Sequence, residues 1–171
     1  MIGKWWRDIQ HPEAGHDTGR SPFFEGWYVK LVSADRAVRL AVIPGLFRSD
    51  TGAEEAFVQV LDGATGRSWY VPYDASEYWV APDRFTIQVG PNRFTGHGVE
   101  LDVQADYLDL SGWVEFTGDF TPWPVTRSAP GAMGWYAWMP FMECYHGVVS
   151  FGHPLGGHLQ MDAGVCDLTG G

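Results

Sequence analysis

The stretch PFMECYHGVVS, residues 140–150, places four proton-active side chains in a row between apolar residues. These side chains are Glu143, Cys144, Tyr145 and His146. A polar group in an apolar segment costs free energy unless a partner satisfies it, so this block is a candidate site for proton transfer. If the segment is a strand, Glu143 and Tyr145 share one face, and Cys144 and His146 share the other.

A second acidic candidate, Glu25, lies in the segment FFEGWYVKLVS, residues 23–33. Alternation along a strand places Glu25 on the same face as Trp27 and places Tyr28 on the opposite face. Burial between aromatic rings disfavours the charged form of a carboxyl group, and a protonated acid in such surroundings can donate a proton. The alternative for Glu25, as for Glu143, is an ordinary structural ion pair, here with Lys30, Arg39 or another base.

The neighbouring histidines and cysteines also have plain structural interpretations. A histidine on an apolar face, such as His146, often packs in the core with its ring nitrogens hydrogen-bonded. Cys144 is expected to be a small buried hydrophobic residue. His146, His153 and His158 would bind zinc only if the chain brought all three together, and exposed turn histidines explain them more simply. We therefore expect no metal and no cofactor, and the sequence holds neither a dinucleotide-binding motif nor a G-x-S-x-G motif.

Hydrophobic residues alternate with period two along most of the chain, which predicts about ten short strands. Gly, Pro, Asp or Asn bounds each of them, and one short helical turn is expected within residues 129–140. The pattern predicts an all-β antiparallel fold with little helix, and both a barrel and a strongly curved sandwich fit it. A barrel of about eight strands or more would enclose a cavity. The predicted strands are 23–33, 37–47, 55–63, 67–73, 84–90, 92–105, 108–118, 142–152, 157–162 and 164–170.

Length and composition indicate one globular domain over residues 1–171, with residues 1–19 as an extended N-terminal tail. Hydrophobic residues make up 45% of the chain and charged residues 19%, which is typical of a folded protein. Aromatic residues reach 15%, with nine tryptophans, and this excess suggests aromatic walls around a ligand. A net charge of -10 makes nucleic acid an unfavourable partner.

Several absences point to the cytoplasm as the expected location. The N-terminus has no apolar region typical of a secretory signal, and no apolar run approaches the length that spans a bilayer. The two cysteines, Cys144 and Cys166, do not form a disulfide framework and fit a reducing compartment.

Four blocks of the chain are more specific than a generic strand pattern: SPFFEGWYVKLV, LAVIPGLF, AFVQVLDGATG and MGWYAWMPFMECYHGVVSFGHPLGGHL. In their order and spacing, from about residue 20 to residue 171, they resemble the tocopherol cyclase family. The resemblance implies a lipocalin-like β fold, usually of two consecutive barrel-like halves. Plant and cyanobacterial members close the chromanol ring of tocopherols, and related lipocalin-like enzymes hydrate carotenoids or catalyse cycloadditions. In the family the DLTGG of residues 167–171 continues into a second half, so the resemblance implies that these residues correspond to the N-terminal half.

The activity that the resemblance implies needs an acid in a dry, aromatic pocket. Ring closure protonates an alkene and lets a phenolic hydroxyl capture the tertiary cation, so the donor must be a desolvated acid. Aromatic faces stabilise such a cation by about 0.5–2 kcal/mol each. Glu143 and Glu25 are the candidate acids, and Tyr145 and His146 are candidates for relaying a proton or orienting the quinol. The candidate substrate-binding residues are Trp27, Tyr28, Trp135, Tyr136 and Trp138.

Two classes of function follow from these features. The first is a tocopherol-cyclase-like enzyme that cyclises, isomerises or hydrates a prenylquinol-like or isoprenoid substrate. The second is a lipocalin-like carrier that binds an apolar ligand without reacting with it, and the fold alone does not separate the two. A third reading is an incomplete half that needs a second half or a homodimer partner. An enzyme of this kind would collect its substrate by peripheral contact with a membrane.

Overall fold

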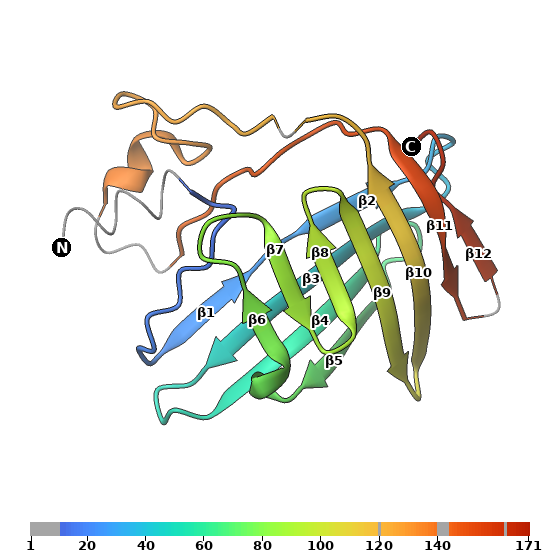
Figure 1. The fold of residues 1–171 in the computed structure, drawn as a ribbon, viewed down its shortest axis with the longest axis horizontal. Helices are drawn as coiled ribbons and strands as arrows, with labels where there is room; N and C mark the ends of the chain where they lie inside the picture. Colours follow the sequence, from blue (N-terminus) through green and yellow to red (C-terminus); the bar gives the residue numbers. More distant parts are fainter. Residues whose placement is uncertain (1–10, 120, 140–143, 163) are drawn as a thin grey trace.

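The computed structural model describes residues 11–119, 121–139, 144–162 and 164–171. Its strands are antiparallel throughout and form two sheets that lie face to face (Figure 1). Within the described residues neither sheet closes on itself. The all-β prediction is therefore confirmed, and of its two forms the structure is the curved sandwich.

The first sheet has five strands built around a long central one. Strand β3 pairs with β1, β2 and β4, and β5 completes the sheet on the far side of β4. The predicted strand 23–33 is two strands, since the ladder breaks after Gly26 and resumes at Val29, but both parts pair with β3. The strands are β1 (Phe23–Gly26), β2 (Val29–Val32), β3 (Arg39–Arg48), β4 (Glu54–Asp62) and β5 (Ser68–Tyr73).

The second sheet has seven strands, each hydrogen-bonded to the next along the chain. The predicted strand 92–105 divides at a turn into β8 and β9, and the short strand β6 was not predicted. The short helical turn expected within residues 129–140 is present as η2 (Gly134–Trp138), and a second turn, η1 (Ala75–Glu77), precedes β6. The strands are β6 (Tyr78–Val80), β7 (Thr86–Val89), β8 (Asn92–Thr95), β9 (Gly98–Ala105), β10 (Leu108–Phe116), β11 (Leu155–Met161) and β12 (Gly164–Asp167).

The inward faces of the two sheets share one hydrophobic core. Every second residue of β7, β9 and β4 is buried, as period-two alternation requires. Burial of this continuous apolar surface is the main force that holds the sheets together. Side chains with no exposed surface come from both sheets and include Leu31, Val42, Val58, Ile87, Phe94, Val103, Leu110 and Leu159.

The structure contradicts the predicted strand 142–152, because residues 144–154 belong to no strand. Strand β10 pairs directly with β11, so the position beside it is already occupied. The described residues between β10 and β11 instead form a long connection, which we call the strap and whose only helix or strand among them is η2. Figure 1 shows it leaving β10, running towards residues 11–20 and returning to β11. A connection of this length with so little regular structure is typical of functional segments.

Candidate active site

A cavity of about 1090 Å³ lies between strands β1 and β2, the N-terminal segment and the strap. The volume lies at the upper end of the range found for small-molecule sites. The residues around it combine an aromatic surface with a few polar groups. The aromatic ones are Phe23, Phe24, Trp27, Tyr28, Phe85, Phe116, Trp123, Tyr145 and Phe151, and the polar ones include His16, Glu25, Lys30, His146, Ser150 and His153.

Glu25 is the buried carboxyl group of this cavity. It lies on β1 opposite Leu46 of β3, and it is 9% exposed, close to the 7% of Trp27 on the same face. Tyr28 faces the other way and is 63% exposed. The predicted alternation along residues 23–33 is therefore confirmed at the residues that matter for the site.

Three donors satisfy the Glu25 carboxyl group. Its Oε1 accepts from the backbone N–H of His16 at 2.8 Å and lies 3.0 Å from His16 Nδ1. Its Oε2 accepts from the Tyr78 hydroxyl at 3.2 Å. The alternative of a structural pair between Glu25 and a base is confirmed in its general form, because His16 is the base that pairs with Glu25. Among the described residues, neither Lys30 nor Arg39 forms an ion pair with it.

The two ring nitrogens of His16 contact different oxygen atoms. Its Nε2 is 3.1 Å from the carbonyl oxygen of His11, and a carbonyl only accepts, so Nε2 carries a hydrogen. Nδ1 faces Glu25 Oε1 at hydrogen-bonding distance, so a proton on Nδ1 or on the carboxyl group would join the two atoms. Glu25 and His16 are therefore a hydrogen-bonded acid–base pair beside the cavity.

The segment that carries His16 is held against the sheets at several points. Trp27 Nε1 donates to the carbonyl of Pro12 at 3.2 Å. Arg48 binds both carboxyl oxygens of Asp17, at 3.0 and 2.8 Å, and also donates to Glu54. The hydrogen bond from Arg48 holds the pKa of Asp17 below its usual value. The described part of the predicted tail, residues 11–19, is thus packed as one wall of the site.

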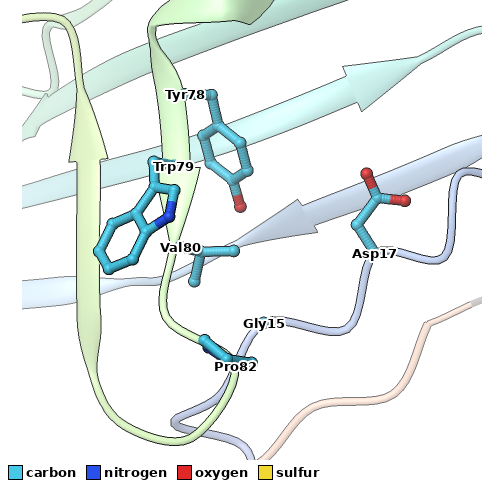
Figure 2. Close-up of a pocket in the computed structure, with 6 residues that line it drawn as sticks. All are labelled: Gly15, Asp17, Tyr78, Trp79, Val80 and Pro82. Atoms are coloured by element: carbon cyan, nitrogen blue, oxygen red, sulfur yellow. The ribbon is translucent and has the colours of Figure 1, made fainter.

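A second, smaller hollow of about 300 Å³ lies between β6 and the N-terminal segment. Figure 2 shows Tyr78 and Val80 of β6 pointing towards the N-terminal segment at Gly15 and Asp17, with Trp79 on the other side of the strand. Tyr78 lines this hollow and also donates to Glu25, which lines the large cavity. Tyr78 therefore links the smaller hollow to the carboxyl group of Glu25.

Tyr78 makes the folded protein sensitive to alkaline pH. Burial, reinforced by the negative charge of Glu25, raises the pKa of Tyr78 well above its usual value. A group with a raised pKa stabilises the fold below its unfolded value of about 10 and loses that contribution as pH rises further. We expect Tyr78→Phe to unfold at a higher pH than the wild type in an alkaline titration followed by circular dichroism. Tyr28→Phe, which changes an exposed hydroxyl, should titrate as the wild type, and equal curves for all three proteins would contradict the assignment.

Tyr145 and His146 border the same cavity as Glu25, but they reach it from the strap instead of a strand. The Tyr145 hydroxyl donates to the carbonyl of Met139, and the backbone N–H of His146 lies 3.3 Å from the Met133 sulfur. Both residues are exposed, so the alternative of a core position for His146 is wrong. Glu143 lies outside the described residues.

The predicted substrate-binding residues fall into two groups. Trp27 and Tyr28 line the cavity. Trp135 and Tyr136 stack on each other at 4.1 Å and are 58% and 52% exposed. Neither of them, nor Trp138, lines the cavity, to which their turn contributes Ala137. Their predicted contact with substrate stays a prediction.

The cysteines and histidines give no metal site within the described ranges, where no three metal-binding side chains come together. Cys144 is exposed, so its predicted burial is wrong, and both Cys144 and Cys166 are free thiols. Burial raises the pKa of Cys166.

His16 and Tyr78 are the two site residues that sequence reasoning missed. His16 falls in the segment predicted as a tail, and Tyr78 falls in the strand that was not predicted. They approach Glu25 across 9 and 53 residues of chain, respectively, so no local spacing links them to it.

Comparison of the chain with family models, curated proteins and solved structures gives no match. Nor does any helix in the described residues have the length and apolar character needed to cross a membrane.

Proposed function

We propose that the protein is a tocopherol-cyclase-like enzyme that protonates a prenylated or otherwise apolar substrate and promotes its cyclisation, isomerisation or hydration. One observation carries this proposal: a buried carboxyl group, Glu25, borders an aromatic cavity and lies at hydrogen-bonding distance from the imidazole of His16. Acid catalysis on an alkene needs an acidic proton held away from bulk water.

Cyclisation in this site would proceed without any net gain or loss of protons. Glu25, supplied by His16, transfers its proton to one carbon of the alkene, and the π electrons form the new C–H bond. The tertiary cation at the other carbon lies against aromatic faces such as that of Trp27. The phenolic oxygen of the substrate then forms the C–O bond, and its proton returns to the pair. Tyr78, which donates to Glu25 Oε2, stabilises the carboxylate left after the first transfer.

The strap supplies the groups that would orient the substrate. Tyr145 and His146 border the cavity and can hydrogen-bond the quinol hydroxyls. Trp123 and Phe151, which meet edge to face at 6.3 Å, offer an apolar surface for the prenyl chain. Glu143 remains a second predicted acid.

Two features support membership of the tocopherol cyclase family. The FEGWY block provides Glu25 and Trp27, and the MECYHGVVS block provides Tyr145 and His146. These blocks, more than one hundred residues apart in the sequence, border one cavity. The exposed pair of Trp135 and Tyr136 fits peripheral contact with a membrane or a second copy of the chain. The free thiols fit a cytoplasmic location.

A non-catalytic carrier is the second candidate function. It is favoured by the three hydrogen bonds to Glu25, which also satisfy a purely structural carboxylate. The two functions differ in what happens to a bound prenylquinol. Incubation with the purified protein, followed by mass spectrometry of the bound and free ligand, should yield ring-closed product. A ligand that binds and is recovered unchanged would support the carrier instead.

A further inference from the structure

We propose that Ser150 and His153 form a nucleophile–base pair in the cavity wall and that the protein hydrolyses carboxylic esters with an apolar acyl chain. The reacting residues of this inference, Ser150 and His153, take no part in the proposed cyclisation, although both reactions would use the apolar surface of Trp123 and Phe151. The inference therefore stands or falls independently of Glu25.

The pair has the arrangement that activates a serine. Ser150 Oγ lies 2.6 Å from His153 Nε2, and His153 Nδ1 lies 3.3 Å from the carbonyl oxygen of Thr117. Because a carbonyl only accepts, the Thr117 contact places the hydrogen of the neutral imidazole on Nδ1. Nε2 then presents its lone pair to the serine O–H. Nucleophile, base and orienting group thus stand in the order found in serine hydrolases.

Further contacts fix the positions of both side chains. The His153 ring stacks on Phe116, the last residue of β10, with ring centres 6.1 Å apart. The backbone N–H of Thr121 donates to Ser150 Oγ at 2.7 Å, which would stabilise negative charge as the hydroxyl loses its proton. Thr117 also joins the two arms of the strap, because its hydroxyl donates to the carbonyl of Pro154 at 2.7 Å.

The surroundings of the pair indicate the class of substrate. Ser150, His153 and Phe116 all border the large cavity, so the serine is accessible to a bound ligand. Trp123 and Phe151 form an apolar surface beside Ser150 in the same cavity. An acyl chain would lie against these rings with its ester carbonyl near the serine oxygen.

The reaction would follow ordinary acyl transfer. Ser150 Oγ forms a bond to the ester carbonyl carbon while its proton moves to His153 Nε2. Collapse of the tetrahedral intermediate breaks the bond to the leaving alcohol, which takes the proton from His153. Water then attacks the acyl-serine by the same steps and releases the carboxylic acid. A carbonyl orients the imidazole but stabilises its cation less than a carboxylate would, so we expect slow turnover of esters and none of amides.

A fluorophosphonate probe tests the inference, because such probes phosphonylate activated serines. We expect the wild-type protein to be labelled, with the label mapped to Ser150 by peptide mass spectrometry. Ser150→Ala should lose the label, and His153→Gln and His153→Asn should be labelled at least about tenfold more slowly. Ser128→Ala, which alters an exposed serine of the same strap, should be labelled as the wild type.

The wild-type result decides the question even if a variant fails to fold. Absence of label at Ser150 in the folded wild type would overturn the proposal. Ser150 and His153 would then have only a structural role, as a hydrogen-bonded contact between the two arms of the strap. Labelling of Ser150 at an undiminished rate in both folded His153 variants would overturn the role of the base. The probe needs no prenylated substrate, so a failed cyclisation assay would not affect the labelling result. Failure of labelling would likewise not affect the cyclisation assay.

Discussion

Replacement of Glu25 by glutamine is expected to lower the turnover of a prenylated quinol by about two to four orders of magnitude. Glutamine keeps the size of the side chain and can still accept from Tyr78, but it has no acidic proton. His16 then has no carboxylic acid through which a proton could reach an alkene. Binding of the quinol should change little, so the loss should appear in kcat and not in KM, as measured by steady-state chromanol formation.

Glu100→Gln is the matched control, because it makes the same chemical change on the exposed face of β9. It should leave turnover unchanged. Glu143→Gln tests the second acid that the sequence suggests. Unchanged turnover in both Glu25→Gln and Glu143→Gln would end the assignment of a carboxylic acid as the proton donor.

Replacement of Gly45 by alanine should destabilise the fold by about 3 kcal/mol, which is at the upper end of the range for overpacking. Gly45 lies on β3 directly opposite Gly26 of β1. A Cβ atom at this position would lie 2.6 Å from the backbone oxygen of Glu25 and would also overlap the Phe57 ring. Because backbone cannot rotate away as a side chain can, β1 itself would have to move. Urea unfolding followed by tryptophan fluorescence measures the loss.

Gly26→Ala provides the control within the same pair of glycines. Its Cβ would meet the Pro44 carbonyl oxygen at 3.3 Å and other atoms only at 3.7 Å, so we expect a clearly smaller loss of stability. The folded fraction of the Gly45→Ala protein should also turn over the quinol more slowly, because β1 carries Glu25. A Gly45→Ala protein as stable as Gly26→Ala would show that β1 and β3 are not as closely packed as described.

Period-two alternation of apolar residues predicts a strand well where the strand has one buried face. It predicted the face shared by Glu25 and Trp27, and it predicted most strands of both sheets to within a few residues. It failed at residues 144–152, where apolar residues line a cavity instead of a sheet interior. The apolar run of Val148 and Val149 therefore predicts a strand, although these side chains line a cavity and do not face the interior of a sheet.

The sequence patterns did not predict that His16 would be the hydrogen-bonding partner of Glu25. His16 depends on how the N-terminal segment folds back across the sheets, and that path is set by contacts such as Arg48 with Asp17 and Trp27 with Pro12. These contacts join residues that are 31 and 15 positions apart, respectively. Their geometry is decided by tertiary packing, which a single sequence read locally does not reveal.

The most direct test of acid chemistry at Glu25 is the reaction of a prenylated quinol in heavy water. Proton transfer from the Glu25–His16 pair predicts a ring-closed product with one deuterium on the former alkene carbon, formed by the wild type and lost in Glu25→Gln. Recovery of the quinol unchanged from the wild-type cavity, or deuterated product formed equally well by Glu25→Gln, would contradict the account.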